Sequence, residues 1–258
     1  MDHPLAELTN WFVDLPRMRC PTCSFGHLRR VKEFVTHESA ASQRVHSNPD
    51  WDPTWVRGVF HRVLVCAHSP CNERVVVAGD FRLADDRTGT LDVIGHYLLT
   101  YARPPLDIVT CPKRTPEAIR AATRDAAEVI WADPSGAAGR LRVAVEELLN
   151  ARKVRKFGPA KAGMRGKRLT TDARIRLFAA ANPDVADVLM AVKWIGNSGA
   201  HESGLSTEDV LEGAQMLTHA LHLIYDPSQA ELAHRVKMVN QRKGPAPRRP
   251  ATAARPKP

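Results

Sequence analysis

The sequence predicts an α+β protein, with a small zinc-ribbon-like β module, a bundle of about five helices and a disordered basic tail. Two cysteine pairs flanked by strand-like runs occupy the first part of the chain. Apolar residues then recur at helical spacing. The final segment is rich in proline and has no aromatic residue, so it cannot build a core. We therefore divide the chain into domains 1–110, 113–240 and 241–258.

The β module has the cysteine spacing of a metal site. A C-x2-C pair is followed by a second pair with four intervening residues, and the second pair stands between the strand-like runs 59–65 and 74–79. Tight turns of this kind let thiolates face one ion while backbone N–H groups point at the sulfurs. We predict a structural Zn²⁺ site, closed to water, whose ligands are Cys20, Cys23, Cys66 and Cys71. The alternatives are four reduced cysteines packed as small apolar side chains, and His68 in place of one ligand.

The helical part has repeated start signals, in which a capping residue precedes proline or an acid. They stand at Thr115-Pro116-Glu117, Asp133-Pro134, Thr171-Asp172, Asn182-Pro183 and Ser206-Thr207-Glu208-Asp209. A last helix is expected over about 228–240. Between 80 and 112 we expect only short β-like pieces, with the domain boundary near 102–114.

Residues 152–168 form a basic loop that contains glycines and no acid. One interpretation is a solvated connection between helices, and the other is a loop that contacts phosphate groups. Under the second interpretation, the candidate nucleic-acid-binding residues are Arg152, Lys153, Arg155, Lys156, Arg165, Lys167 and Arg168.

A second candidate site follows the helix that reaches Gly196. Asn197 and His201 are four residues apart, so they share one face if the helical turn continues. Lys193 lies one turn earlier. Together these three residues could hold a phosphate and move a proton from a ribose 2′-hydroxyl. The alternative is a helix that ends at Gly196-Asn197, with His201 as a cap or a buried hydrogen-bond partner.

Three features together resemble the bacterial domain of unknown function 4145 family. They are the two cysteine pairs, the helix with Arg142 and Glu146, and the string from Trp194 to His201 followed by a capped helix ending at Tyr225. The resemblance covers roughly 20–226. It implies a helical bundle similar to the HEPN superfamily, in which many members are metal-independent RNases and others are interaction modules.

The RNase motif of that superfamily is an arginine, a polar residue and a histidine a few residues on, with two copies meeting across a dimer. Asn197 and His201 match its polar residue and histidine, but Gly196 stands where the arginine would be. Lysine does not reproduce the planar, bidentate geometry of a guanidinium, so Lys193 is no equivalent. Whether the protein is an enzyme is left open.

Two functional hypotheses follow from the resemblance. The first is a non-catalytic interaction or nucleic-acid-associated module, in a phage-defence or toxin–antitoxin setting, with RNA or another protein as partner. The alternative is a metal-independent RNase that uses His201 and Asn197. Either would be a homodimer through the helical bundle.

The charge distribution and hydropathy place the protein in solution. The formal net charge is +9, but six basic residues and no acid lie in 241–258, which leaves +3 for the rest. The basic balance is therefore largely a property of the tail. No apolar run approaches the roughly 20 residues that span a bilayer, and the N-terminus lacks a signal-peptide pattern. We expect a cytoplasmic protein without a membrane segment.

Overall fold

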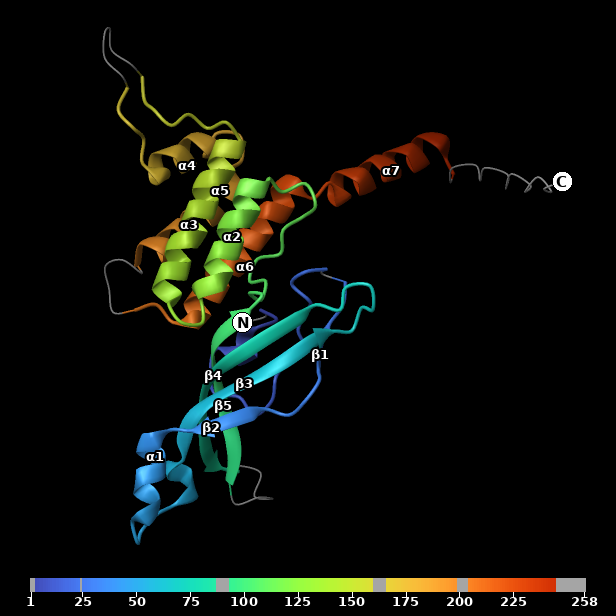
Figure 1. The fold of residues 1–258 in the computed structure, drawn as a ribbon. Coiled ribbons are helices and arrows are strands. Elements are labelled where there is room, and N and C mark those ends of the chain that lie inside the picture. Colours follow the sequence, from blue (N-terminus) through green and yellow to red (C-terminus); the bar gives the residue numbers. More distant parts are fainter. Residues whose placement is uncertain (1–2, 24, 87–92, 160–165, 199–203, 245–258) are drawn as a thin grey trace, which may run out of the picture.

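The computed structural model describes residues 3–23, 25–86, 93–159, 166–198 and 204–244. An antiparallel sheet forms the N-terminal part, and a helical bundle stacks at one end of it (Figure 1). This arrangement confirms the predicted α+β class. The sheet ends at Arg103, and the first helix of the bundle begins at Glu117.

The sheet has five strands: β1 (Leu28–Arg30), β2 (Val35–Glu38), β3 (Arg57–Cys66), β4 (Arg74–Asp85) and β5 (Val93–Arg103). All pairs are antiparallel, and β1 and β2 share one edge of β3, while β4 and β5 follow on its other side. Alternate residues of β4 are buried, including Val75, Val77 and Phe81, as expected for a sheet with one covered face.

The expectation of short β-like pieces over 80–112 is wrong. The structure has instead two long paired strands, β4 and β5. Most residues of β5 are half-buried on both faces, so its sequence lacks the alternation that identifies a strand.

The N-terminal segment before β1 packs against the sheet as a largely irregular stretch of chain. Phe12 pairs with Tyr97 through two backbone hydrogen bonds of 2.9 and 2.8 Å. Its ring joins those of Phe34, Phe60 and Tyr97 in a cluster with centroids 3.8–6.5 Å apart. The Arg62 guanidinium lies 4.3 Å from the Phe34 ring centroid, almost fully buried. Phe12 and Phe60 belong to the buried core, and the partly buried Phe34 and Tyr97 pack against it.

The bundle consists of α2 (Glu117–Val129), α3 (Pro134–Ala151), α4 (Thr171–Ala179), α5 (Pro183–Ser198) and α6 (Thr207–Tyr225). The first residue of α3 is proline, after an Asp133 cap, and α6 begins with the capping box between Ser206 and Asp209. The apolar stripes of α3, α5 and α6 meet in a core of leucine, valine and alanine side chains.

The last helix, α7 (Ser228–Arg242), projects away from the bundle (Figure 1). Most of its described side chains are exposed, including Leu232, Val236 and Val239. Among the described residues, no helix has the length and apolarity required to cross a membrane.

Candidate functional site

The four cysteines predicted as metal ligands come together at one end of the sheet. Cys20 and Cys23 lie in the turn before β1, Cys66 ends β3, and Cys71 lies in the turn before β4. Their sulfur atoms all lie within 4.8 Å of one another, with no disulfide among them. The Cys20–Cys71 and Cys23–Cys66 Sγ–Sγ distances are 3.8 and 3.7 Å. A tetrahedral ion with metal–sulfur distances of about 2.3 Å would separate its ligands by about 3.8 Å. The cluster is therefore compatible with a metal ion.

Backbone N–H groups point at two of these sulfurs. The amide nitrogen of Gly26 lies 3.4 Å from the Cys23 Sγ, and that of His68 lies 3.4 Å from the Cys66 Sγ. A side chain at position 26 would collide with the Cys66 sulfur, so the turn requires glycine. His68 thus contributes its backbone here, and the metal-competent cluster among the described residues contains cysteines alone.

Without a bound ion, the surroundings of the four thiols favour ionisation of one of them, Cys23. The Gly26 N–H stabilises the Cys23 thiolate and lowers its pKa to about 6. Burial instead raises the pKa of Cys66 to about 12. A bound cation would deprotonate all four thiols, because a coordinating thiol loses its proton outright.

The second predicted site is only partly described. Lys193 is buried, and its Nζ lies 3.1 Å from the Asp172 Oδ1 of α4 and 3.3 Å from the Trp194 ring centroid. Its charge is neutralised within the protein, so phosphate binding by Lys193 would require this pair to break. Asn197 is half-buried within α5, and His201 lies outside the described residues.

Gly196 lies at a close crossing of α5 with α3. A Cβ atom at this position would stand 2.9 Å from the Ala138 carbonyl oxygen and 2.9 Å from the Arg142 Cβ. A side chain cannot enter without moving the helices apart. The position that corresponds to the RNase arginine is therefore sterically closed. α5 continues to Ser198, one residue past the end at Gly196-Asn197 that the alternative predicted.

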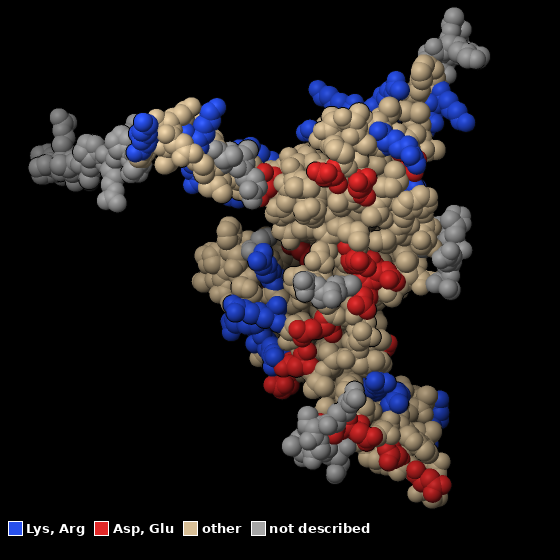
Figure 2. Space-filling view, turned by 180° about the vertical axis from the view of Figure 1, so that it is seen from behind, with Lys and Arg blue, Asp and Glu red and all other residues tan. Residues whose placement is uncertain are grey.

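The basic loop is a narrow arm built from two antiparallel segments. Phe157 pairs with Arg168 across the arm. The Gly158 N–H donates to the Lys167 carbonyl and the Leu169 N–H to the Lys156 carbonyl, both at 2.9 Å. The candidate residues that are described are all exposed: Arg152, Lys153, Arg155, Lys156, Lys167 and Arg168. Arg165 lies outside the described residues. Figure 2 shows Lys and Arg side chains gathered around this projecting arm.

Arg174 fixes the base of the arm. This buried residue of α4 donates from Nη2 to the Asn150 Oδ1 at 2.9 Å and to the Val154 carbonyl at 3.0 Å. The Thr170 hydroxyl accepts from the Ala173 N–H and caps α4 where the arm returns. Both ends of the arm are thus attached to the bundle.

Sequence reasoning missed the aromatic residue of this arm. Phe157 stands among the basic residues with half of its surface exposed (50%). Its signal was present in the sequence, as an isolated aromatic within a basic, glycine-containing loop.

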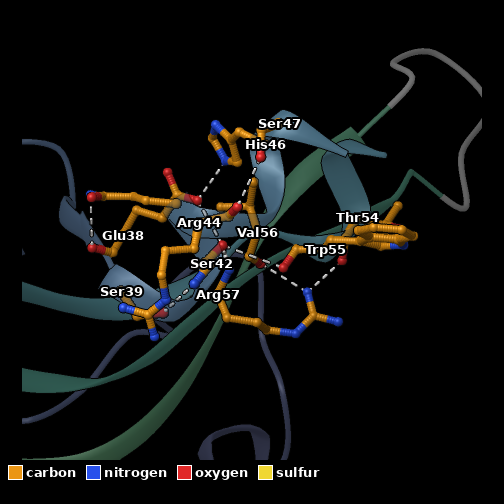
Figure 3. A network of polar contacts seen from close by, with 11 residues as sticks. Glu38, Ser39, Ser42, Arg44, His46, Ser47, Thr54, Trp55, Val56 and Arg57 are labelled. Atoms are coloured by element: carbon orange, nitrogen blue, oxygen red, sulfur yellow. Dashed lines mark hydrogen bonds and ion pairs between the residues drawn. The ribbon is translucent and has the colours of Figure 1, made fainter. Parts of the chain in front are cut away.

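A serine, a glutamate and a histidine meet beside the short helix α1 (Ala40–Arg44), as Figure 3 shows. The Ser42 hydroxyl donates to the Glu38 Oε1 at 2.6 Å, and the His46 Nε2 lies 2.7 Å from the same oxygen. In a nucleophilic triad the histidine stands between serine and acid, whereas here the carboxylate stands between the other two. The Ser42 hydroxyl also accepts from the Arg57 N–H at 3.1 Å. The network therefore holds α1 against β2 and β3.

A cleft of about 560 Å³ separates the first cysteine turn from α2. Asp107, Arg120 and Arg124 are among its lining residues, and the sequence did not single them out. The pKa of Asp107 is raised to about 6, because surrounding protein removes water from the carboxyl, although the residue as a whole is exposed to solvent. The nearby Arg124 charge opposes this rise without cancelling it.

Two family models match the chain. Residues 13–104 match a domain of unknown function, DUF8608, and residues 124–242 match another, DUF4145. No curated protein and no solved structure matches the chain. The DUF4145 match begins at 124, so the predicted resemblance over 20–226 extended too far toward the N-terminus. The cysteine pairs lie in the separate DUF8608 match, whereas the string from Trp194 to Tyr225 lies within the match to the predicted family. The helical part of this chain, residues 124–242, is therefore similar to the DUF4145 family.

Proposed function

We propose that this protein is a non-catalytic nucleic-acid-binding module, whose basic arm contacts phosphate groups. The observation that carries the proposal is the arm itself. Residues 152–168 contain eight basic residues and no acid, and the six described candidate residues are all exposed. Among the described residues, Arg155, Lys156, Lys167 and Arg168 form no ion pair with a carboxylate. Their charges remain available for phosphate, and phosphate contacts supply most of the affinity in non-specific binding.

The closed position at Gly196 favours a module without catalysis. A metal-independent RNase needs a positive group at the scissile phosphate, and the charge of Lys193 is already paired with Asp172. The alternative function, RNA cleavage by His201 with Asn197 as the orienting residue, remains the second candidate. It is favoured by the position of Asn197 on the last turn of α5, from which the chain continues toward His201.

We assign the cysteine module a supporting role. Its four ligands would hold a Zn²⁺ ion that closes the turns before β1 and β4, because a four-thiolate site leaves no open position for water. Zinc supplies folding free energy at such sites. Beside the cluster, the Cys20 turn lines the cleft next to α2, so the ion would also order this side of the bundle.

The proposal is tested by binding to fluorescein-labelled RNA of mixed sequence, measured by anisotropy over a salt series. The variant replaces Arg155, Lys156, Lys167 and Arg168 with glutamine. The log–log slope of affinity against salt should weaken by about 0.7 for each phosphate of the single strand that the variant no longer neutralises, and so by up to about 3. An unchanged slope would show that the arm does not bind phosphate.

A matched control variant carries the same change in charge elsewhere. Arg235, Lys237, Arg242 and Lys243 on and after α7 are exposed, and their replacement with glutamine also removes four positive charges. If the affinity of the two variants falls equally, the effect reflects net charge rather than the arm. Incubation with RNA and EDTA tests the second candidate, because cleavage by the wild type but not by His201→Ala would establish the RNase.

A further inference from the structure

The exposed aromatic ring of Phe157 bears on whether the arm binds single-stranded or duplex nucleic acid. Large aromatic side chains are usually buried, and single-strand-binding proteins place exposed rings beside basic residues so that bases can stack on them. Phe157 is 50% exposed and stands at the narrow, paired part of the arm.

The hydrogen bonds around Phe157 fix the residues that share its face. The bonds Gly158 N–H to Lys167 and Leu169 N–H to Lys156 lie on either side of the Phe157–Arg168 pair, which itself exchanges none. In such a pair the side chains lie on the same face, with Cα atoms about 4.5 Å apart. The Arg168 side chain therefore stands next to the ring.

The residues next to this pair carry further positive charge. Lys156 and Lys167, each next to one member of the pair, project to the other side. The chain bends at Lys156, and Arg155 lies exposed just before this bend. One face of the arm then presents an aromatic ring beside the Arg168 guanidinium, with the exposed Arg155 nearby along the chain, and the opposite face presents two ammonium groups. Guanidinium groups both pair with phosphate and stack on flat rings.

We propose that this face binds single-stranded nucleic acid, with a base stacked on Phe157 and the adjoining phosphates held by Arg155 and Arg168. The inference rests on the proposed function and adds the class of ligand. A duplex keeps its bases stacked within the helix, so it can offer its phosphates to the arm but no free base to the ring. The attachment of the arm by Arg174 and the Thr170 cap holds this face in place before the ligand arrives.

The experiment uses the full chain and four labelled probes of equal length: single-stranded RNA, single-stranded DNA of the same sequence, the corresponding DNA duplex, and an abasic single strand. Phe157→Leu keeps an apolar side chain without a flat ring, and Phe157→Tyr keeps the ring. The leucine variant should bind the base-carrying single strands about 5- to 150-fold more weakly, and the tyrosine variant should bind them as the wild type does. Both variants should bind the duplex and the abasic strand unchanged, and their unfolding temperatures should match that of the wild type.

The outcomes separate this inference from the function on which it rests. Binding of either the RNA or the DNA single strand with the expected dependence on Phe157 supports it. Equal binding of the leucine variant and the wild type, or equal affinity for base-carrying and abasic strands, overturns stacking but leaves phosphate binding intact. Absence of binding to all four probes overturns both. Displacement of Phe157-dependent binding by an acidic peptide, with no preference for bases, would assign the face to a protein partner instead.

Discussion

Replacing Gly196 with alanine should weaken the bundle by a steric clash that the structure locates. The added Cβ would meet the Ala138 carbonyl oxygen and the Arg142 Cβ, each at 2.9 Å. Neither atom is the end of a flexible side chain, so α3 and α5 must separate. Overpacking of this kind costs about 1–3 kcal/mol.

The matched control is Gly139 in α3, where an added Cβ meets nothing within 4 Å. Both substitutions gain about 1 kcal/mol of helix propensity, so the difference between the two variants isolates the clash. Thermal unfolding followed by circular dichroism should place the melting temperature of Gly196→Ala about 2–12 °C below that of Gly139→Ala.

Equal melting temperatures for the two variants would refute the close crossing. They would also reopen position 196 to a side chain, and with it the argument that an arginine is excluded there. Gly196→Arg extends the test, because a larger side chain should lower the melting temperature further. A stable Gly196→Arg protein that cleaves RNA would refute steric closure and show that the missing guanidinium is what separates this chain from an RNase.

Three further predictions concern the paired, metal-binding and titrating groups. Asp172→Asn should destabilise the protein by about 1–3 kcal/mol in chemical denaturation, because it leaves the buried Lys193 ammonium unpaired, and adding Lys193→Met should recover part of the stability; no recovery would contradict the pairing. Wild-type protein purified without chelator should contain about one zinc ion per chain by metal analysis, and the Cys71→Ser variant should contain much less zinc. A wild-type protein that contains no metal, and whose melting temperature does not change after chelation, would exclude the site. Asp107→Asn should raise stability at pH 7, because the folded-state pKa of about 6 lies above the unfolded value and the ionised carboxyl is disfavoured. This gain should shrink as the pH falls through 6 and vanish below about pH 4, and a gain that grows at low pH would contradict the desolvation of this carboxyl.

Local sequence signals predicted most elements because their causes are local. Caps, proline at first helical positions and apolar stripes identified the helices, since each acts within a few residues along the chain. Spacing and flanking strands alone grouped the four cysteines as ligands of one metal site, and the structure places their sulfur atoms together. The long strand β5 could not be predicted, because both of its faces are half-covered and its period is lost.

The sequence by itself determined the α+β class, the four cysteines, the basic loop and the relation of the helical part to DUF4145. Only the tertiary structure decided the surroundings of these residues, because the surroundings depend on contacts between residues far apart in the chain. The Lys193 charge is paired with Asp172, 21 residues away, and the space at Gly196 is closed by α3. Likewise, pairing across the arm places Phe157 beside Arg168, and our proposal of a base-stacking face starts from this pair.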